Sequence, residues 1–114
     1  MLCMFMKNKS VIIGGTSGIG FETACYLMDS GYDVIIGGRS KCENDRGIAC
    51  HYIDVTKEES VEQFFSSVDM NSIDSLVYSA GVTIKKKSIE AFDVPDYLRL
   101  HDVNLLGAIL TLKY

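Results

Sequence analysis

The sequence predicts an α/β domain with a doubly wound parallel sheet, incomplete at four strands in the order 3-2-1-4. Short apolar runs typical of buried strands alternate along the chain with segments of helical pattern. A glycine-rich turn lies directly after the first apolar run and opens the first helix. The 114 residues suffice for one hydrophobic core but are few for a sheet of this kind.

The first strand is predicted at residues 10–13 and the first helix at residues 21–28. Gly31 follows this helix where a glycine with left-handed backbone ends many helices. Glycines in a turn between strand and helix let the backbone pass close to a diphosphate, which the free N–H groups and positive dipole end of the helix then bind. We therefore expect a dinucleotide site at this turn, the alternative being a purely structural one. The turn consists of Gly14, Gly15, Thr16, Ser17, Gly18, Ile19 and Gly20.

The second strand is predicted at residues 32–36, ended by Gly37 and Gly38, and the third at residues 48–53. Eleven residues separate Ile36 from Ile48, which is close to the lower limit for a parallel crossover connection. The crossover helix between these strands is therefore expected to be stunted or missing.

The second helix is predicted to begin with a capping box formed by Thr56 and Glu59. Apolar residues then recur at the spacing of one buried helix face. These residues are Val61, Phe64, Phe65 and Val68.

The fourth strand is predicted at residues 73–78. The last helix is predicted to begin after Asp93 as its N-cap, with Pro95 in its first turn. Apolar residues line one side of this last helix, with others beside them. The side consists of Leu98, Leu105, Ile109 and Leu112, and beside it lie Leu106 and Leu110. The chain is expected to form a homo-oligomer through this side of the helix or through the open edge of the fourth strand.

Composition excludes several classes of function. The net charge of −4 argues against a nucleic-acid partner, and no apolar run approaches the roughly 18 residues that a membrane span needs. The apolar residues 1–5 are too short for a signal sequence. We expect a leader at residues 1–9, a domain at residues 10–114, and a cytoplasmic location. The basic run at residues 85–87 is interpreted as a solvated loop, or as a device that attracts an anionic ligand.

The cysteines predict neither a metal site nor a disulfide framework. The chain has four, and none forms a C-x-x-C pair or lies at ligand spacing from a histidine. Cys25 falls in a predicted helix and Cys50 in a predicted strand, where a free thiol behaves as a small hydrophobic group. The other two are Cys3 and Cys42.

From residue 10 to about residue 112 the chain resembles the short-chain dehydrogenases/reductases, which have a Rossmann-type fold. Their cofactor motif, Thr-Gly-x-x-x-Gly-Ile-Gly, matches the glycine turn with Ile13 in place of the threonine. Their acidic residue after the third strand matches Asp54, and their Asn-Asn-Ala-Gly motif corresponds to residues 78–81, where both asparagines are replaced. Their Val-Asn-Leu-x-Gly motif matches residues 103–107.

The resemblance implies a nicotinamide dinucleotide cofactor, with Asp54 contacting adenine and with Ala80 and Gly81 leaving room for the ribose and phosphates. Asp54 could instead be a helix-entry residue, and Gly81 part of a simple turn. Asn104 lies among apolar residues, so its amide needs a specific partner or a wet cleft. The family associates this asparagine with an active-site proton relay, and a structural hydrogen bond is the alternative.

The end of the second strand favours NADP(H) over NAD(H). Enzymes for NAD usually place a carboxylate there for the ribose 2′-hydroxyl, whereas this chain has Arg39 and Ser40, and no carboxylate before Glu43. Arg39 can bind a 2′-phosphate through charge-assisted hydrogen bonds, assisted by Ser40, Thr16 and Ser17. The alternative is that Arg39 is a solvated loop residue.

The family's catalytic serine and Tyr-x-x-x-Lys pair have no counterpart in these 114 residues, because no tyrosine is followed by a lysine four positions later. The first hypothesis is therefore the cofactor-binding, N-terminal part of an NADP(H)-dependent oxidoreductase for a small carbonyl or alcohol substrate, itself inactive. The alternatives are a non-catalytic dinucleotide-binding module and a degenerate fragment without a ligand.

Overall fold

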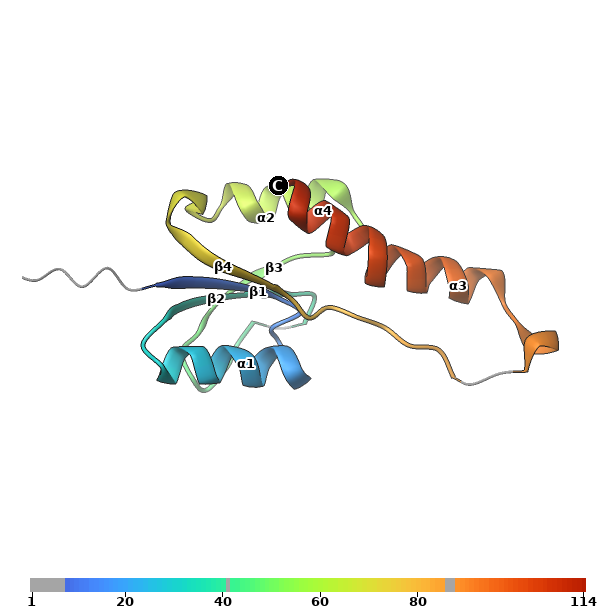
Figure 1. Ribbon diagram of the computed structural model, residues 1–114, viewed down its shortest axis with the longest axis horizontal. Coiled ribbons are helices and arrows are strands. Elements are labelled where there is room, and N and C mark those ends of the chain that lie inside the picture. Colours follow the sequence, from blue (N-terminus) through green and yellow to red (C-terminus); the bar gives the residue numbers. More distant parts are fainter. Residues whose placement is uncertain (1–7, 41, 86–87) are drawn as a thin grey trace, which may run out of the picture.

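The computed structural model describes residues 8–40, 42–85 and 88–114, and it has the predicted parallel sheet in the order β3-β2-β1-β4 (Figure 1). β1 pairs with both β2 and β4, and β3 pairs with β2. The doubly wound α/β fold is thereby confirmed. The strands are β1 (Lys9–Ile13), β2 (Asp33–Gly38), β3 (Ala49–Tyr52) and β4 (Ile73–Tyr78).

The helices cover both faces of the sheet (Figure 1). α1 lies on one face, α2 and α4 lie side by side on the other, and α3 extends beyond the end of the sheet. Across the described ranges, no helix has the length and apolarity that a bilayer crossing requires. The helices are α1 (Gly18–Asp29), α2 (Glu58–Ser66), α3 (Val94–His101) and α4 (Gly107–Lys113), with short 3₁₀ turns at η1 (Met70–Ser72) and η2 (Ile89–Ala91).

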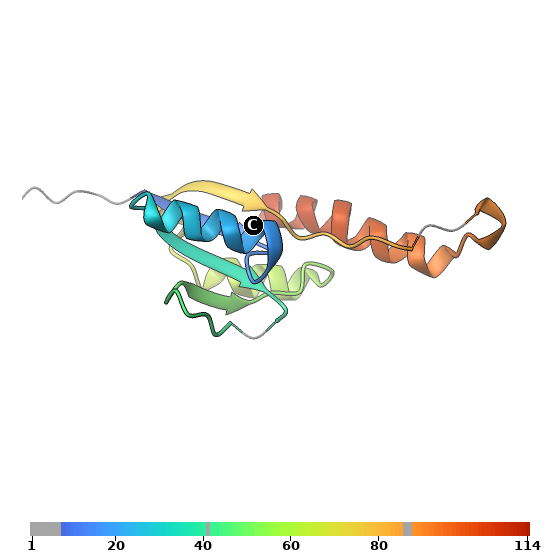
Figure 2. The same ribbon diagram turned by 90° about the horizontal axis from the view of Figure 1, so that it is seen from below.

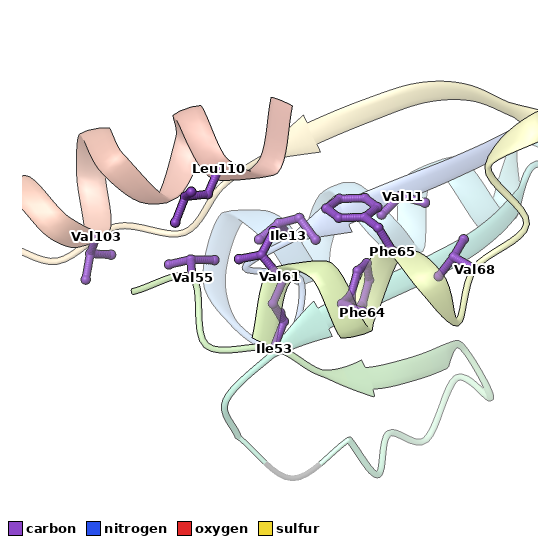
Figure 3. Packing of buried hydrophobic residues seen from close by; sticks show 10 residues of the cluster. All are labelled: Val11, Ile13, Ile53, Val55, Val61, Phe64, Phe65, Val68, Val103 and Leu110. Carbon is purple, nitrogen blue, oxygen red and sulfur yellow. The ribbon is translucent and has the colours of Figure 1, made fainter. Parts of the chain in front are cut away.

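Side chains of β1 alternate between two hydrophobic clusters, one on each face of the sheet. Val11 and Ile13 are fully buried on the face covered by α2 and α4, as Figure 3 shows, whereas Ile12 is buried on the α1 face. Ile12 lies there with Ala24 and Cys25 of α1. β1 is therefore the central strand of the domain.

α2 confirms the predicted buried face but not the predicted capping box. Val61, Phe64, Phe65 and Val68 are all buried. The helix begins at Glu58, and its N-cap is Lys57. The capping-box prediction is wrong because the Thr56 hydroxyl donates to the Asp54 carboxylate instead.

The connection from β2 to β3 has no helix over its described residues, as its length predicted. β2 continues through Gly37 and Gly38, which were expected to end it. A Cβ atom on Gly37 would lie 2.8 Å from the Phe64 ring, so the glycine lets α2 pack onto this strand. Figure 2, seen from the α1 side, shows the connection and β3 with no helix in front of them.

Cys42 and Cys50 form a disulfide across this connection, with their Cα atoms 5.2 Å apart. The expectation of no disulfide, and of a free thiol at Cys50, is therefore wrong. Sequence spacing could not reveal the pair, because the irregular connection returns Cys42 to the side of β3. Cys25 is free and buried, as predicted. Cys3, the leader up to residue 7 and two of the three lysines at 85–87 lie outside the described residues.

The last helix begins after Asp93 with a proline in its first turn, as predicted. A π-helical turn, η3 (Asp102–Leu106), joins α3 to α4 without a break (Figure 1). Val103 and Leu110 are buried against the sheet side. The predicted apolar side is half or more exposed at each position, namely Leu98, Leu105, Ile109 and Leu112.

Replacing Phe64 by alanine is expected to lower the free energy of unfolding by about 3–5 kcal/mol, the usual result of deleting a buried aromatic ring. Phe64 is 2% exposed, and its ring packs edge-to-face on Phe65 and His51. The measurement is urea unfolding followed by circular dichroism. The control is Glu62→Ala at an exposed position of α2, expected to change stability by about 0.5 kcal/mol or less. Equal effects of the two variants would contradict the assignment of this core.

Candidate functional site

A cleft of about 480 Å³ lies at the carboxyl edge of the sheet, where the ends of β1, β2 and β4 and the residues after β3 meet. Open α/β sheets bind ligands at this edge, and the volume suits a small molecule or cofactor. Ten of the residues predicted to bind a cofactor line the cleft. These are Gly14, Thr16, Ser17, Gly18, Ile19, Arg39, Ser40, Asp54, Ala80 and Gly81.

The glycine turn begins with a close approach of three strand ends. The N–H groups of Gly14 and Gly15 both donate to the carbonyl of Gly37, at 2.8 and 3.2 Å. Gly14 has a φ of +84°, and a Cβ atom there would lie 2.6 Å from the Ser79 carbonyl carbon after β4. Only glycine satisfies both the backbone angle and this contact.

The amino end of α1 faces the cleft. Gly18 has a φ of +55°, and a Cβ atom on it would meet nothing within 4 Å. The N-cap residue Ser17 makes no capping hydrogen bond with its side chain, and the first turn of α1 carries no acidic residue. The first N–H groups of the helix and its positive dipole end can therefore bind an anion in the cleft.

Gly20 does not line the cleft, although it belongs to the same turn. It is buried, and a Cβ atom on it would overlap the carbonyl oxygen of Gly14. Close packing between α1 and the turn therefore explains why this position of the motif is a glycine.

Arg39 and Ser40 follow β2 and are exposed at the rim of the cleft. Thr16 packs beneath this strand end, since a Cβ atom on Gly38 would lie 2.6 Å from the Thr16 side chain. The geometry thus brings the guanidinium of Arg39 and the hydroxyl groups of Thr16, Ser17 and Ser40 to one cleft, a set of donors suited to a phosphate.

Asp54 follows β3 and places a nearly buried carboxylate in the cleft. Its Oδ1 atom accepts hydrogen bonds from the Thr56 N–H (3.1 Å) and hydroxyl (2.7 Å), and its Oδ2 atom lies 3.9 Å from the Lys57 ammonium. Burial raises the pKa of the Asp54 carboxyl. The bonds from Thr56 and the attraction of Lys57 and Arg39 outweigh that effect together, so the pKa lies below its ordinary value.

Asn104 lies outside the cleft lining and has the specific partner that its sequence position required. Its side-chain Oδ1 accepts from the Val82 N–H at 2.8 Å, and its Nδ2 donates to the Val82 carbonyl at 2.9 Å. Asn104 belongs to the π-helical turn η3. The amide therefore fixes the chain just after Gly81 against the last helix.

Tyr78 is a structural residue of this edge that the sequence did not identify. Its hydroxyl donates to the carbonyl of Val103, next to Asn104, and burial raises the pKa of Tyr78 to about 12. It thus remains a protonated donor at neutral pH. A signal was present, because Tyr78 stands where the family motif has an asparagine.

The other residues in the cleft lining were not predicted, since most are apolar or glycine and continue the strand ends. They are Ile13, Gly38, Ile53, Val55, Thr56, Ser79, Val82 and Val103. Among the residues that the structure describes, no group of three or more potential metal ligands lies together.

Comparison with protein families finds that the short chain dehydrogenase model matches residues 8–114. Among curated proteins, the chain is 30% identical over 121 residues to cis-4-hydroxycyclohexanecarboxylate dehydrogenase of Sinomonas cyclohexanicum, covering 96% of this chain and 49% of that protein. It is also 30% identical over 122 residues to D-beta-hydroxybutyrate dehydrogenase of Rhizobium meliloti, covering 95% and 47%. The chain thus spans about half the length of these relatives.

Among solved structures, an ElxO variant with NADPH bound superimposes with a TM-score of 0.84 at 25% identity. The superposition covers 95% of this chain and 48% of that one.

Replacing Asp54 by asparagine is expected to lower stability at neutral pH and to remove part of its dependence on pH. Because the folded-state pKa of Asp54 is depressed below 3.8, its contribution is present above that value and is lost as pH falls through the folded-state pKa. The difference in free energy of unfolding between the two proteins should therefore shrink from about pH 5 to about pH 2. Urea unfolding at several pH values measures it, and a constant difference would contradict the role of the charge.

Proposed function

The chain belongs to the short-chain dehydrogenase family, and on that premise we propose that it is the NADP(H)-binding part of an oxidoreductase acting on a small alcohol or carbonyl substrate. One observation carries the proposal. The glycine turn, the amino end of α1, Arg39 and Asp54 all line one cleft at the carboxyl edge of the sheet.

The cleft suits a dinucleotide because it offers open backbone at the glycine turn together with positively charged groups and one carboxylate. The diphosphate would lie against Gly18 and the amino end of α1, where no Cβ atom blocks it. The adenine amino group would donate to the Oδ2 atom of Asp54. This oxygen is free to accept, because the Lys57 ammonium lies 3.9 Å from it, which is too far for a hydrogen bond. Ala80 and Gly81 would leave room for the ribose next to the nicotinamide.

The preference for NADP(H) is supported by the residues that follow β2. Arg39 and Ser40 lie at the rim, and no carboxylate of β2 faces the ribose from this strand end. A 2′-phosphate would receive charge-assisted hydrogen bonds from the Arg39 guanidinium, with the hydroxyls of Ser40 and Thr16 nearby.

The bound cofactor would supply the hydride that is exchanged with the substrate. This chain's residues would bind and orient the cofactor, and Asn104 would hold the segment after Gly81 in place through Val82. In line with the family resemblance, we propose that Asn104 also takes part in the proton relay. Hydride transfer itself would need a serine and a Tyr-x-x-x-Lys pair, so we expect the 114-residue chain to bind the cofactor without turnover. We also propose that it acts in the cytoplasm.

A non-catalytic dinucleotide-binding module is the second candidate. It is favoured by the hydrogen bonds of Asn104, because its amide oxygen already accepts from the Val82 N–H and its amide nitrogen already donates to the Val82 carbonyl. Both candidates bind the same cofactor, and only the first belongs to a protein with turnover.

Arg39→Ala is expected to weaken NADPH binding roughly tenfold to a hundredfold while leaving NADH binding nearly unchanged. A charge-assisted hydrogen bond contributes about 1.5–3 kcal/mol, and only NADPH carries the 2′-phosphate. Calorimetric titration of the 114-residue chain with each nucleotide measures the effect. The matched control is Arg99→Ala, which removes an exposed arginine of α3 away from the cleft.

Equal loss of affinity for both nucleotides in Arg39→Ala would contradict the proposed phosphate contact. If a folded wild-type chain bound neither nucleotide, the proposed cofactor site itself would be wrong.

Self-association through the exposed apolar side of α3 and α4 is also proposed, because a row of leucine and isoleucine side chains is open to solvent. The double variant Leu105→Glu/Ile109→Glu is expected to shift the chain from oligomer to monomer in light scattering. The control is Glu90→Gln at an exposed position outside this side. A wild-type chain that is already monomeric at tens of micromolar, roughly the range of moderate association, would contradict this proposal.

A further inference from the structure

We propose that Cys42 and Cys50 form a reversible thiol–disulfide switch that controls how tightly the chain binds a nucleotide with a 2′-phosphate. The inference rests on the proposed NADP(H) site, because the disulfide closes the connection that carries Arg39 and Ser40.

The two cysteines join the rim of the cleft to the edge of the sheet. Cys42 lies two residues after Ser40, and Cys50 lies in β3, where it pairs with Ile36 of β2. The disulfide therefore ties the segment that follows Arg39 covalently to the sheet.

The half of the connection nearest β3 has its own anchors. The Asn44 side chain bonds both the N–H and the carbonyl of Ile48, at 3.0 and 2.9 Å, and Ile48 is buried. Arg46 forms an ion pair with Asp29 at the end of α1. The Asn44 side chain also donates to the Cys42 carbonyl, but at 3.4 Å this hydrogen bond is long and weak. Breaking the disulfide would therefore loosen the half that carries Arg39 and Ser40 more than residues 44–48.

Over its described residues this connection contains no helix, unlike the β1 to β2 connection, which contains α1. Figure 2 shows the β2–β3 connection lying open beside the sheet. Packing on α1 holds the connection at Ile48, which lies in the cluster of Ala24 and Cys25. Nearer the rim, the disulfide at Cys42 is the covalent constraint, so the rim is sensitive to the state of this bond.

Thiols in solution can reach the pair, since both cysteines are partly exposed. Two molecules of a small thiol of the glutathione class reduce it. Their two S–H bonds break, the Cys42–Cys50 bond breaks, two protein thiols form and the small molecules leave joined as a disulfide. Two electrons and two protons pass to the protein, and the corresponding small disulfide reverses the reaction. Thiol pools of this kind are present in the cytoplasm.

Reduction should lower the fraction of molecules in which Arg39 and Ser40 are positioned to bind the 2′-phosphate. The apparent affinity for NADPH falls in proportion to that fraction. NADPH affinity should fall about tenfold, equivalent to 1.4 kcal/mol. NADH lacks the 2′-phosphate that Arg39 and Ser40 would contact, so its affinity should change by about twofold or less.

The test is calorimetric titration of the 114-residue chain with NADPH and with NADH, after equilibration with glutathione disulfide or with reduced glutathione. Mass spectrometry of alkylated peptides measures how much of the pair is bonded in each sample. Cys42→Ser should bind NADPH as weakly as the reduced wild type under both conditions. Cys25→Ser is the matched control, since Cys25 is buried in α1 and outside the disulfide, and it should keep the full response.

Equal NADPH affinity in the bonded and reduced chains would overturn the switch and leave the proposed function intact. Failure of the pair to form with glutathione disulfide would also overturn it. If neither nucleotide bound the folded chain in either redox state, the proposed function would be wrong. The proposed control of nucleotide binding by the disulfide would then be overturned as well.

Hydrogen exchange at residues 39–48 tests the mechanical step without any nucleotide. Faster exchange at residues 39–43 than at residues 44–48 on reduction supports the release of the rim. Unchanged exchange at residues 39–43 overturns it.

Discussion

The carboxyl edge of the sheet depends on close backbone contact at the glycine turn. Gly14 and Gly15 both bond the carbonyl of Gly37 in β2, and the Ser79 N–H bonds the carbonyl of Ile13 in β1. A side chain at Gly14 would push the ends of β1 and β4 apart, and one at Gly20 would push α1 away from the turn. Everything that gives the cleft its chemistry follows from this contact, because it brings the amino end of α1, the rim after β2 and the segment after β4 around one space.

The cleft holds charges of both signs. Asp54 stays ionised, although it is nearly buried, because Thr56 bonds its carboxylate and Lys57 and Arg39 attract it. Arg39 and the amino end of α1 provide positive charge to the same cleft. A long ligand with an amino group at one part and phosphates at another matches this arrangement better than a simple anion does.

Local patterns predicted the strands, their order, the helix face at Val61 and Phe64, and most of the cleft lining. They failed where a side chain bonds a residue other than the predicted one, or where a turn departs from regular geometry. Thr56 bonds Asp54 instead of capping α2, and Cys42 meets Cys50 only because the irregular connection turns back on β3. The π-helical turn leaves no spacing signal of its own.

The π-helical turn also sets the rotation of the last helix relative to the sheet. Each residue of a helix turns the chain by about 100°, and η3 sets which side of α4 meets the sheet, with Gly107, Leu110 and Thr111 buried. Losing one residue between Asp102 and Leu106 would rotate α4 so that Thr111 took the core-facing place of Leu110, and Leu112 took that of Thr111. A change in the number of residues in this turn would therefore alter every contact that α4 makes with the sheet, whereas a substitution there alters only the contacts of one side chain.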